Sequence, residues 1–108
     1  MGWESVGDAA TLQAQGHAVY RRDEHDIALR LVKGRWLGFQ NHCPHRGLPL
    51  VESNIDGSGA TLTCNGHLWQ FDLATGKCST VPEPRNQLKL YPTKIENGTL
   101  YVFLSAWK

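Results

Sequence analysis

The sequence contains two short segments, CPHRGL at residues 43–48 and CNGHLW at residues 64–69, in which a histidine closely follows a cysteine. The first segment has a C-x-H pattern and the second a C-x-x-H pattern. Thiolates and imidazoles are ligands both of zinc sites and of mixed-ligand iron–sulfur clusters. The two segments therefore predict a metal centre whose four ligands are Cys43, His45, Cys64 and His67.

The ligand spacing distinguishes one metal ion from two. Cys43 and His45 are two residues apart, so in an extended loop their side chains project to one side but are separated by roughly 6–7 Å. Zinc sites usually pair two cysteines or two histidines within one short segment, whereas each segment here is mixed. In a binuclear [2Fe–2S] cluster with two thiolates on one iron and two imidazoles on the other, each segment supplies one ligand to each iron. The spacing favours this cluster, and a structural zinc site is the alternative.

The composition indicates one soluble globular domain. The chain has 108 residues, 41% of them hydrophobic and 19% charged, with a formal net charge of +1. This charge provides no basic excess for nucleic acid, no apolar run is long enough to cross a bilayer, and the N-terminus lacks a signal-peptide pattern. We therefore expect a cytoplasmic protein that binds neither nucleic acid nor a membrane.

The cysteine count fits a reducing compartment. There are three cysteines, and if two of them bind metal, no disulfide can form within the chain. We expect the third, Cys78, to be a buried, small apolar residue. Three histidines have no cysteine at a useful spacing and are expected at the surface: His17, His25 and His42.

Short β-branched, aromatic and aliphatic runs predict an all-β sandwich or small barrel. We expect strands at residues 17–22, 27–32, 35–41, 61–64, 68–72, 87–95 and 99–104. Asn97-Gly98 is the strongest hairpin signal, and only residues 7–15 could form a helical turn. Two stretches rich in proline and glycine, residues 43–59 and 78–86, read as loops that carry binding chemistry.

The two metal-ligand segments resemble the ligand motifs of the Rieske family, in the same order and at nearly the same separation. The Pro-rich stretch at residues 81–84 is similar to the loop that covers the cluster in that family, and the hairpin at residues 89–104 resembles its final strands. The resemblance implies a single domain over residues 1–108, a Rieske-type antiparallel β-sandwich. It also implies a small cluster-binding subdomain, at about residues 41–86, that holds one Rieske-type [2Fe–2S] cluster.

Two departures from the high-potential members of this family predict a low potential. Their bridging cysteines correspond to Leu48 and Gly66, so that disulfide cannot form here. Their serine and tyrosine hydrogen-bond donors correspond to Trp69 and Phe71, which have no hydroxyl group. Fewer donors to sulfur stabilise the reduced state less, so we expect a potential of roughly −150 to 0 mV.

The resemblance also implies a function. Four protein ligands leave no open position for a substrate, and the sequence has no second catalytic constellation, so we expect an electron carrier rather than an enzyme. Small, soluble Rieske proteins without the disulfide are typically ferredoxin components of multicomponent oxygenases, and we expect this chain to be a monomer. Such ferredoxins bind transiently to an NAD(P)H-dependent flavin reductase and to a terminal oxygenase.

The type of oxygenase and one alternative role remain open. The run HLWQF at residues 67–71 looks most like the ferredoxins of diiron monooxygenases, and ring-hydroxylating dioxygenase systems are a close second. The alternative role is an electron-transfer subunit or domain of another redox complex, such as a nitrite reductase small subunit.

Overall fold

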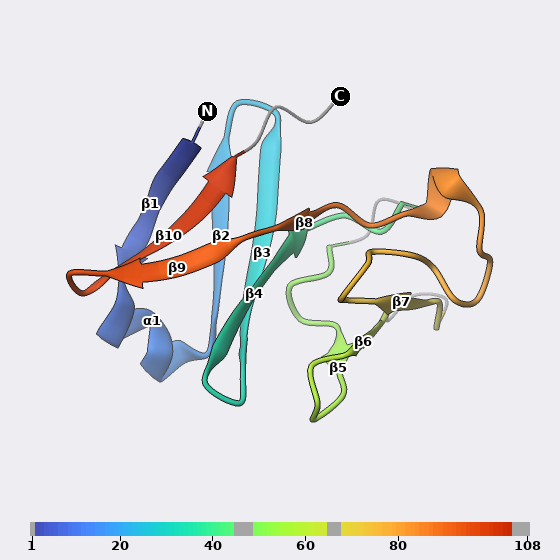
Figure 1. Cartoon of the computed structure of the whole chain (residues 1–108), viewed down its shortest axis with the longest axis horizontal. Helices are drawn as coiled ribbons and strands as arrows, with labels where there is room; N and C mark the ends of the chain where they lie inside the picture. The colour runs from blue at the N-terminus through green and yellow to red at the C-terminus, as the bar shows by residue number, and fades with distance from the viewer. Residues whose placement is uncertain (1, 45–48, 65–67, 105–108) are drawn as a thin grey trace.

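The computed structural model describes residues 2–44, 49–64 and 68–104, and its strands form three antiparallel sheets (Figure 1). The first sheet has the order β1 (Gly2–Asp8), β10 (Thr99–Leu104), β9 (Thr93–Glu96). The second has the order β2 (His17–Arg22), β3 (His25–Val32), β4 (Arg35–Gln40), β8 (Leu90–Tyr91). The third has the order β5 (Asn54–Ile55), β6 (Thr61–Thr63), β7 (Gln70–Asp72). The expected all-β class is confirmed.

The second sheet is buried on both faces. In β3 the consecutive residues Ile27, Ala28 and Leu29 are all 0% exposed. Because neighbouring side chains of a strand point to opposite faces, Ile27 and Leu29 pack in one core while Ala28 packs in the other. The sheet therefore forms a layer between the β1-β10-β9 sheet on one side and the lobe that contains β5, β6 and β7 on the other (Figure 1).

Two hydrophobic cores follow from this arrangement. We call the first two sheets together the base. The base core lies between these two sheets and consists of Ala18, Ile27, Leu29, Trp36, Tyr91, Leu100, Val102 and Leu104. The lobe core lies under the third sheet and consists of Ala28, Phe39, Cys43, Leu50, Leu62, Cys64, Phe71, Leu73, Cys78 and Leu88. All three cysteines thus belong to the lobe core, and Cys78 is buried as expected.

The lobe is an insertion between β4 and β8, and its two ends lie side by side. Gln40 N–H donates to the Lys89 carbonyl oxygen (2.9 Å), and Lys89 N–H donates to Oε1 of Gln40 (2.8 Å). The backbone and the side chain of one residue therefore join the point where the chain leaves the base to the point where it returns. We call this pairing the neck of the lobe.

The hairpin expected at Asn97-Gly98 is present between β9 and β10. Both residues have positive φ, 52° and 77°, as a two-residue type I′ turn requires. The run expected as one strand at residues 87–95 is instead two strands, because Pro92 between them has no N–H for a ladder. β8 pairs with β4, and β9 pairs with β10, so the run crosses from the second sheet to the first.

Two N-terminal elements differ from expectation. Strand β1 was not predicted, yet it pairs with β10 in the register Trp3↔Phe103. Residues Ala9–Gln15 form a helix, α1, rather than only a possible turn. At the N-terminus of α1, the Asp8 carboxylate accepts a hydrogen bond from Thr11 N–H (3.0 Å). The backbone and side-chain hydrogen bonds from Thr11 lower the pKa of Asp8.

Among the described residues, no helix is long and apolar enough to cross a membrane.

Gly76 should be among the least replaceable residues of the lobe. Gly76 has a φ of +83°, and a Cβ at this position would overlap the carbonyl oxygen of Leu88. The N–H of Leu88 in turn donates to the carbonyl oxygen of Gly76 (2.6 Å). We expect Gly76→Ala to lower the free energy of unfolding by about 3 kcal/mol, from left-handed strain plus steric overlap. Urea denaturation followed by circular dichroism measures the change.

Gly98→Ala is the matched control. Gly98 has a similar φ of +77° but no atom within 4 Å of the added Cβ, so it should cost only the backbone strain, about 1–2 kcal/mol. Equal losses in the two variants would contradict the steric role assigned to Gly76.

Candidate metal centre

Two of the four predicted ligands lie together in the lobe core. Cys43 follows the end of β4 and Cys64 follows the end of β6, and each is 1% exposed. They belong to one apolar cluster that includes Phe71 and Leu50. Ligands distant in the sequence are thus brought to the same water-excluded region, and their thiol groups could supply the two sulfur ligands of one iron.

Each ligand segment is closed at its base by backbone pairing. On the first segment, His42 and Pro49 form an antiparallel bridge around Cys43 and the residues that follow it. On the second, Cys64 N–H donates to the Trp69 carbonyl oxygen (2.8 Å) and Leu68 N–H donates to the Cys64 carbonyl oxygen (2.8 Å). Both cysteines are therefore held by the scaffold at the start of a short loop.

The two predicted histidine ligands, His45 and His67, lie outside the described residues, as do Leu48 and Gly66. Their assignment as ligands or tuning positions stays a prediction. The described donor set is a pair of buried thiols at the bases of two loops, and this set fits the thiolate half of a mixed cysteine–histidine cluster.

The residues predicted to tune the cluster lie beside the cysteines. Phe71 is 0% exposed in the lobe core, and the half-buried Trp69 packs against the same core. Neither side chain carries a hydroxyl group. The two positions predicted to tune the cluster therefore place aromatic carbon, and no hydroxyl group, in the same core as Cys64.

The Pro-rich third segment runs beside β7. Ser79 N–H donates to the Gln70 carbonyl oxygen (2.8 Å), and Gln70 N–H donates to Oγ1 of Thr80 (2.9 Å). Further along the segment, Val81 N–H points to Sγ of Cys78 at 3.4 Å. Cys78 thus has a local structural role in this segment.

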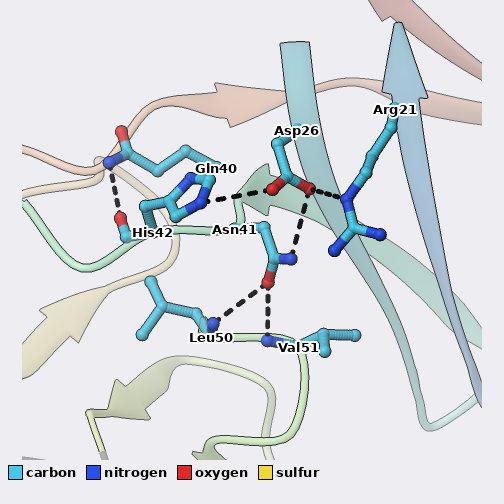
Figure 2. A network of polar contacts seen from close by, with 7 residues as sticks. All are labelled: Arg21, Asp26, Gln40, Asn41, His42, Leu50 and Val51. Carbon is cyan, nitrogen blue, oxygen red and sulfur yellow. Dashed lines mark hydrogen bonds and ion pairs between the residues drawn. The ribbon is translucent and has the colours of Figure 1, made fainter. Parts of the chain in front are cut away.

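The three histidines expected at the surface are placed unequally. His17 and His42 are exposed, whereas His25 is only half-exposed. His42 Nε2 lies 3.2 Å from Oδ2 of Asp26. Sequence reasoning missed the buried Asn41, whose side chain contacts Leu50 and Val51, just beyond the first ligand segment (Figure 2). An asparagine before a Pro-rich loop reads as an ordinary turn residue, so no local signal marked it.

Comparisons with known proteins agree with the metal centre. The Rieske [2Fe-2S] domain family matches residues 2–95. The alkene monooxygenase ferredoxin component of Xanthobacter autotrophicus is 32% identical over 85 residues, which is 78% of this chain and 66% of that protein. The 3-phenylpropionate/cinnamic acid dioxygenase ferredoxin subunit of Photorhabdus laumondii is 31% identical over 74% of each chain.

Other relatives are much longer proteins. Pheophorbide a oxygenase of Oryza sativa is 32% identical over 83 residues, and the chain spans only 15% of its length. The chain likewise spans 23% of the 4beta-methylsterol monooxygenase of Methylococcus capsulatus.

A solved structure shares the fold. The Sphingomonas yanoikuyae B1 ferredoxin has a TM-score of 0.74 at 23% identity, covering 94% of this chain and 98% of that one. The expected Rieske-type fold is thus confirmed, and the family match assigns a Rieske-type [2Fe–2S] cluster as the cofactor. From its matched residues and its fold, this chain belongs to the Rieske [2Fe–2S] domain family.

Proposed function

We propose that this chain is a one-electron carrier in which Cys43 and Cys64 bind one iron of the cluster and His45 and His67 bind the other. The observation that carries the proposal is that two buried thiols, from the bases of two loops, belong to the same core in a chain that matches the Rieske domain over residues 2–95. When bound, the cluster supplies one-electron redox chemistry. Residues 1–108 would form one domain, with the cluster-binding subdomain at about residues 41–86.

The chain's own residues suit electron transfer better than bond chemistry. With four protein ligands, neither iron keeps an open position for a substrate, which metal catalysis normally needs. Phe71 and Trp69 offer no hydroxyl donor to sulfur, so the added negative charge of the reduced state is stabilised less. These features favour a carrier of low potential.

The proposed partners are an NAD(P)H-dependent flavin reductase, which would supply electrons, and a terminal oxygenase, which would accept them. Relatives that this chain matches over similar shares of both sequences are ferredoxin components of a monooxygenase and a dioxygenase system, which supports this role. A similar fold occurs in a structure described as a complex of oxygenase and ferredoxin in carbazole 1,9a-dioxygenase. We expect transient complexes with a monomeric carrier in the cytoplasm.

The alternative is an electron-transfer unit of a larger redox protein or complex. It is favoured by relatives such as pheophorbide a oxygenase, in which the matched region is a small part of a long chain. Gel filtration of this chain with the products of neighbouring genes distinguishes the two roles. A free shuttle elutes alone, whereas an obligate subunit co-elutes with its complex.

The three cysteines provide a test of the ligand assignment, because all are equally buried at 1% exposure. We expect Cys43→Ser and Cys64→Ser each to abolish cluster binding, measured as iron and sulfide content and visible absorption. Cys78→Ser should retain a full cluster, since its role is a hydrogen bond from Val81 N–H. Loss of the cluster in all three variants, or in none, would contradict the assignment.

The potential tests the tuning role of the aromatic side chains. We expect an equilibrium redox titration of the wild-type protein to give a midpoint of roughly −150 to 0 mV. Phe71→Tyr should raise the midpoint, because a hydroxyl at this buried position can donate to a cluster or ligand sulfur. A wild-type midpoint near roughly +300 mV, the upper end of the Rieske range, would refute the prediction.

Leu68 tests whether partners dock at the ligand loops. It is 71% exposed and has a φ of +60°, an unfavourable backbone conformation for leucine. Leu68→Asn should fold at least as stably, because asparagine tolerates this conformation. It should slow electron transfer to the oxygenase about three- to tenfold, because part of a buried leucine contact is lost.

Stopped-flow reduction of the oxygenase component measures this rate. Ile95→Asn is the control, because Ile95 is also exposed (49%) but lies in β9 of the base sheet. Equal slowing by both variants would argue against docking at the loops.

A further inference from the structure

Asn41 joins both ends of the first ligand segment through one buried side chain, which is shown in Figure 2. The residue is 1% exposed and precedes Cys43 by two positions. Its Oδ1 accepts from Leu50 N–H (3.0 Å) and from Val51 N–H (2.9 Å), beyond the other end of the segment. The carboxamide oxygen therefore adds to the backbone pairing that closes this loop, in which Leu50 N–H also donates to the Asn41 carbonyl oxygen (3.1 Å).

The other side of the carboxamide is fixed to the base. Asn41 Nδ2 donates to Oδ1 of Asp26 (3.2 Å), and Asn41 N–H donates to the Asp26 carbonyl oxygen (2.9 Å). The Asp26 carboxylate also lies 3.2 Å from Arg21 Nε and 3.2 Å from His42 Nε2 (Figure 2). An acceptor-only carboxylate on one side and two backbone donors on the other leave only one favourable orientation for the amide.

A second base residue holds the same stretch of backbone. Arg30 Nη1 donates to the carbonyl oxygens of Val51 (3.0 Å) and Ser53 (2.6 Å). Val51 is therefore held at its N–H by Asn41 and at its carbonyl by Arg30. The far end of the ligand segment is fixed to β3 and β4 by side chains that are not themselves metal ligands.

We propose that Asn41 is a positioning residue for the cluster: it holds the first ligand segment in the geometry that Cys43 and His45 need for metal binding. The proposal rests on the proposed function, because it takes these two residues as ligands. Without the carboxamide, Val51 N–H loses its acceptor, and Leu50 N–H keeps only the Asn41 backbone carbonyl oxygen (3.1 Å). Leaving Val51 N–H and the Asp26 carboxylate without these partners is costly, so the backbone after the segment would shift to find others and would move the ligands with it.

The test compares three proteins with wild type. Asn41→Ala removes both the acceptor and the donor. The double variant Asn41→Asp with Asp26→Asn exchanges the two groups: the carboxylate at 41 accepts from both N–H groups, and the amide at 26 donates to it. Thr93→Val is the control, because it removes a half-buried hydrogen bond from Thr93 Oγ1 to the Trp36 carbonyl oxygen (2.9 Å), which joins β9 of the first sheet to β4 of the second.

Two measurements report on the cluster itself. The g values of the reduced protein by electron paramagnetic resonance report ligand geometry, and the loss of visible absorption in the presence of an iron chelator gives the rate of cluster release. Each rate is measured at the same interval below that variant's unfolding temperature, so that a general loss of stability does not affect the comparison.

We expect Asn41→Ala to shift the g values and to release the cluster about tenfold faster than wild type or Thr93→Val. The double variant should recover the wild-type g values and a release rate within about twofold of wild type, because the three side-chain hydrogen bonds of residue 41 are restored. Of the ion pairs of residue 26, the one that the exchange breaks is with Arg21, whose side chain is 69% exposed, so its loss should matter little. If Asn41→Ala fails to load a cluster, recovery of loading in the double variant gives the same support.

A merely structural role predicts a different result. In that case Asn41→Ala unfolds at a lower temperature, but its g values and release rate match those of Thr93→Val, and the proposal is overturned. Failure of the double variant to recover either property, when Thr93→Val is normal, also overturns it. A wild-type protein without a [2Fe–2S] signal would instead refute the proposed function, so the two failures are distinguishable.

Discussion

The central constraint on this molecule is that both faces of its second sheet are buried at β3. Three consecutive residues, Ile27, Ala28 and Leu29, are fully buried, which is possible only if apolar material covers both faces. One face completes the base core and the other forms the floor of the lobe core. Because burying each large aliphatic side chain contributes about 1.5–3 kcal/mol, removing either cover would leave part of this strand unfavourably exposed.

The two thiols proposed to bind metal belong to the lobe core, and the two ligand segments differ in the side chains that support them. Cys64 is anchored by short backbone hydrogen bonds to Leu68 and Trp69, so its segment is closed largely by its own chain. The first segment is bridged by backbone between His42 and Pro49 and is held in addition by two side chains, Asn41 and Arg30. The described residues that these side chains contact, Val51 and Ser53, lie outside strands, where backbone polar groups have no ladder to pair with.

The parts of the structure that depend on local signals could be predicted from the sequence. Asn97-Gly98 specified its hairpin because both residues tolerate positive φ. The mixed C-x-H and C-x-x-H spacing indicated the cluster, because the spacing of two ligands within one short segment decides whether both can bind the same metal ion. The register of β1 depends on β10 at the other end of the chain. Likewise, Asn41 acquires its role only when Leu50 and Val51 fold back beside it. Neither feature has a local signature.

The neck at Gln40 and Lys89 has a consequence for how such proteins diversify. Since the lobe enters and leaves the base at one hydrogen-bonded point, its length and sequence can change while the ends keep the same separation, and loop closure depends only weakly on length. Chimaeras in which lobes are exchanged between related chains at this junction should tolerate the graft when the sheet residues that contact the lobe are exchanged with it: Asp26, Ala28, Arg30 and Phe39. Recombination at the neck would then need to carry along only a few positions of the supporting sheet.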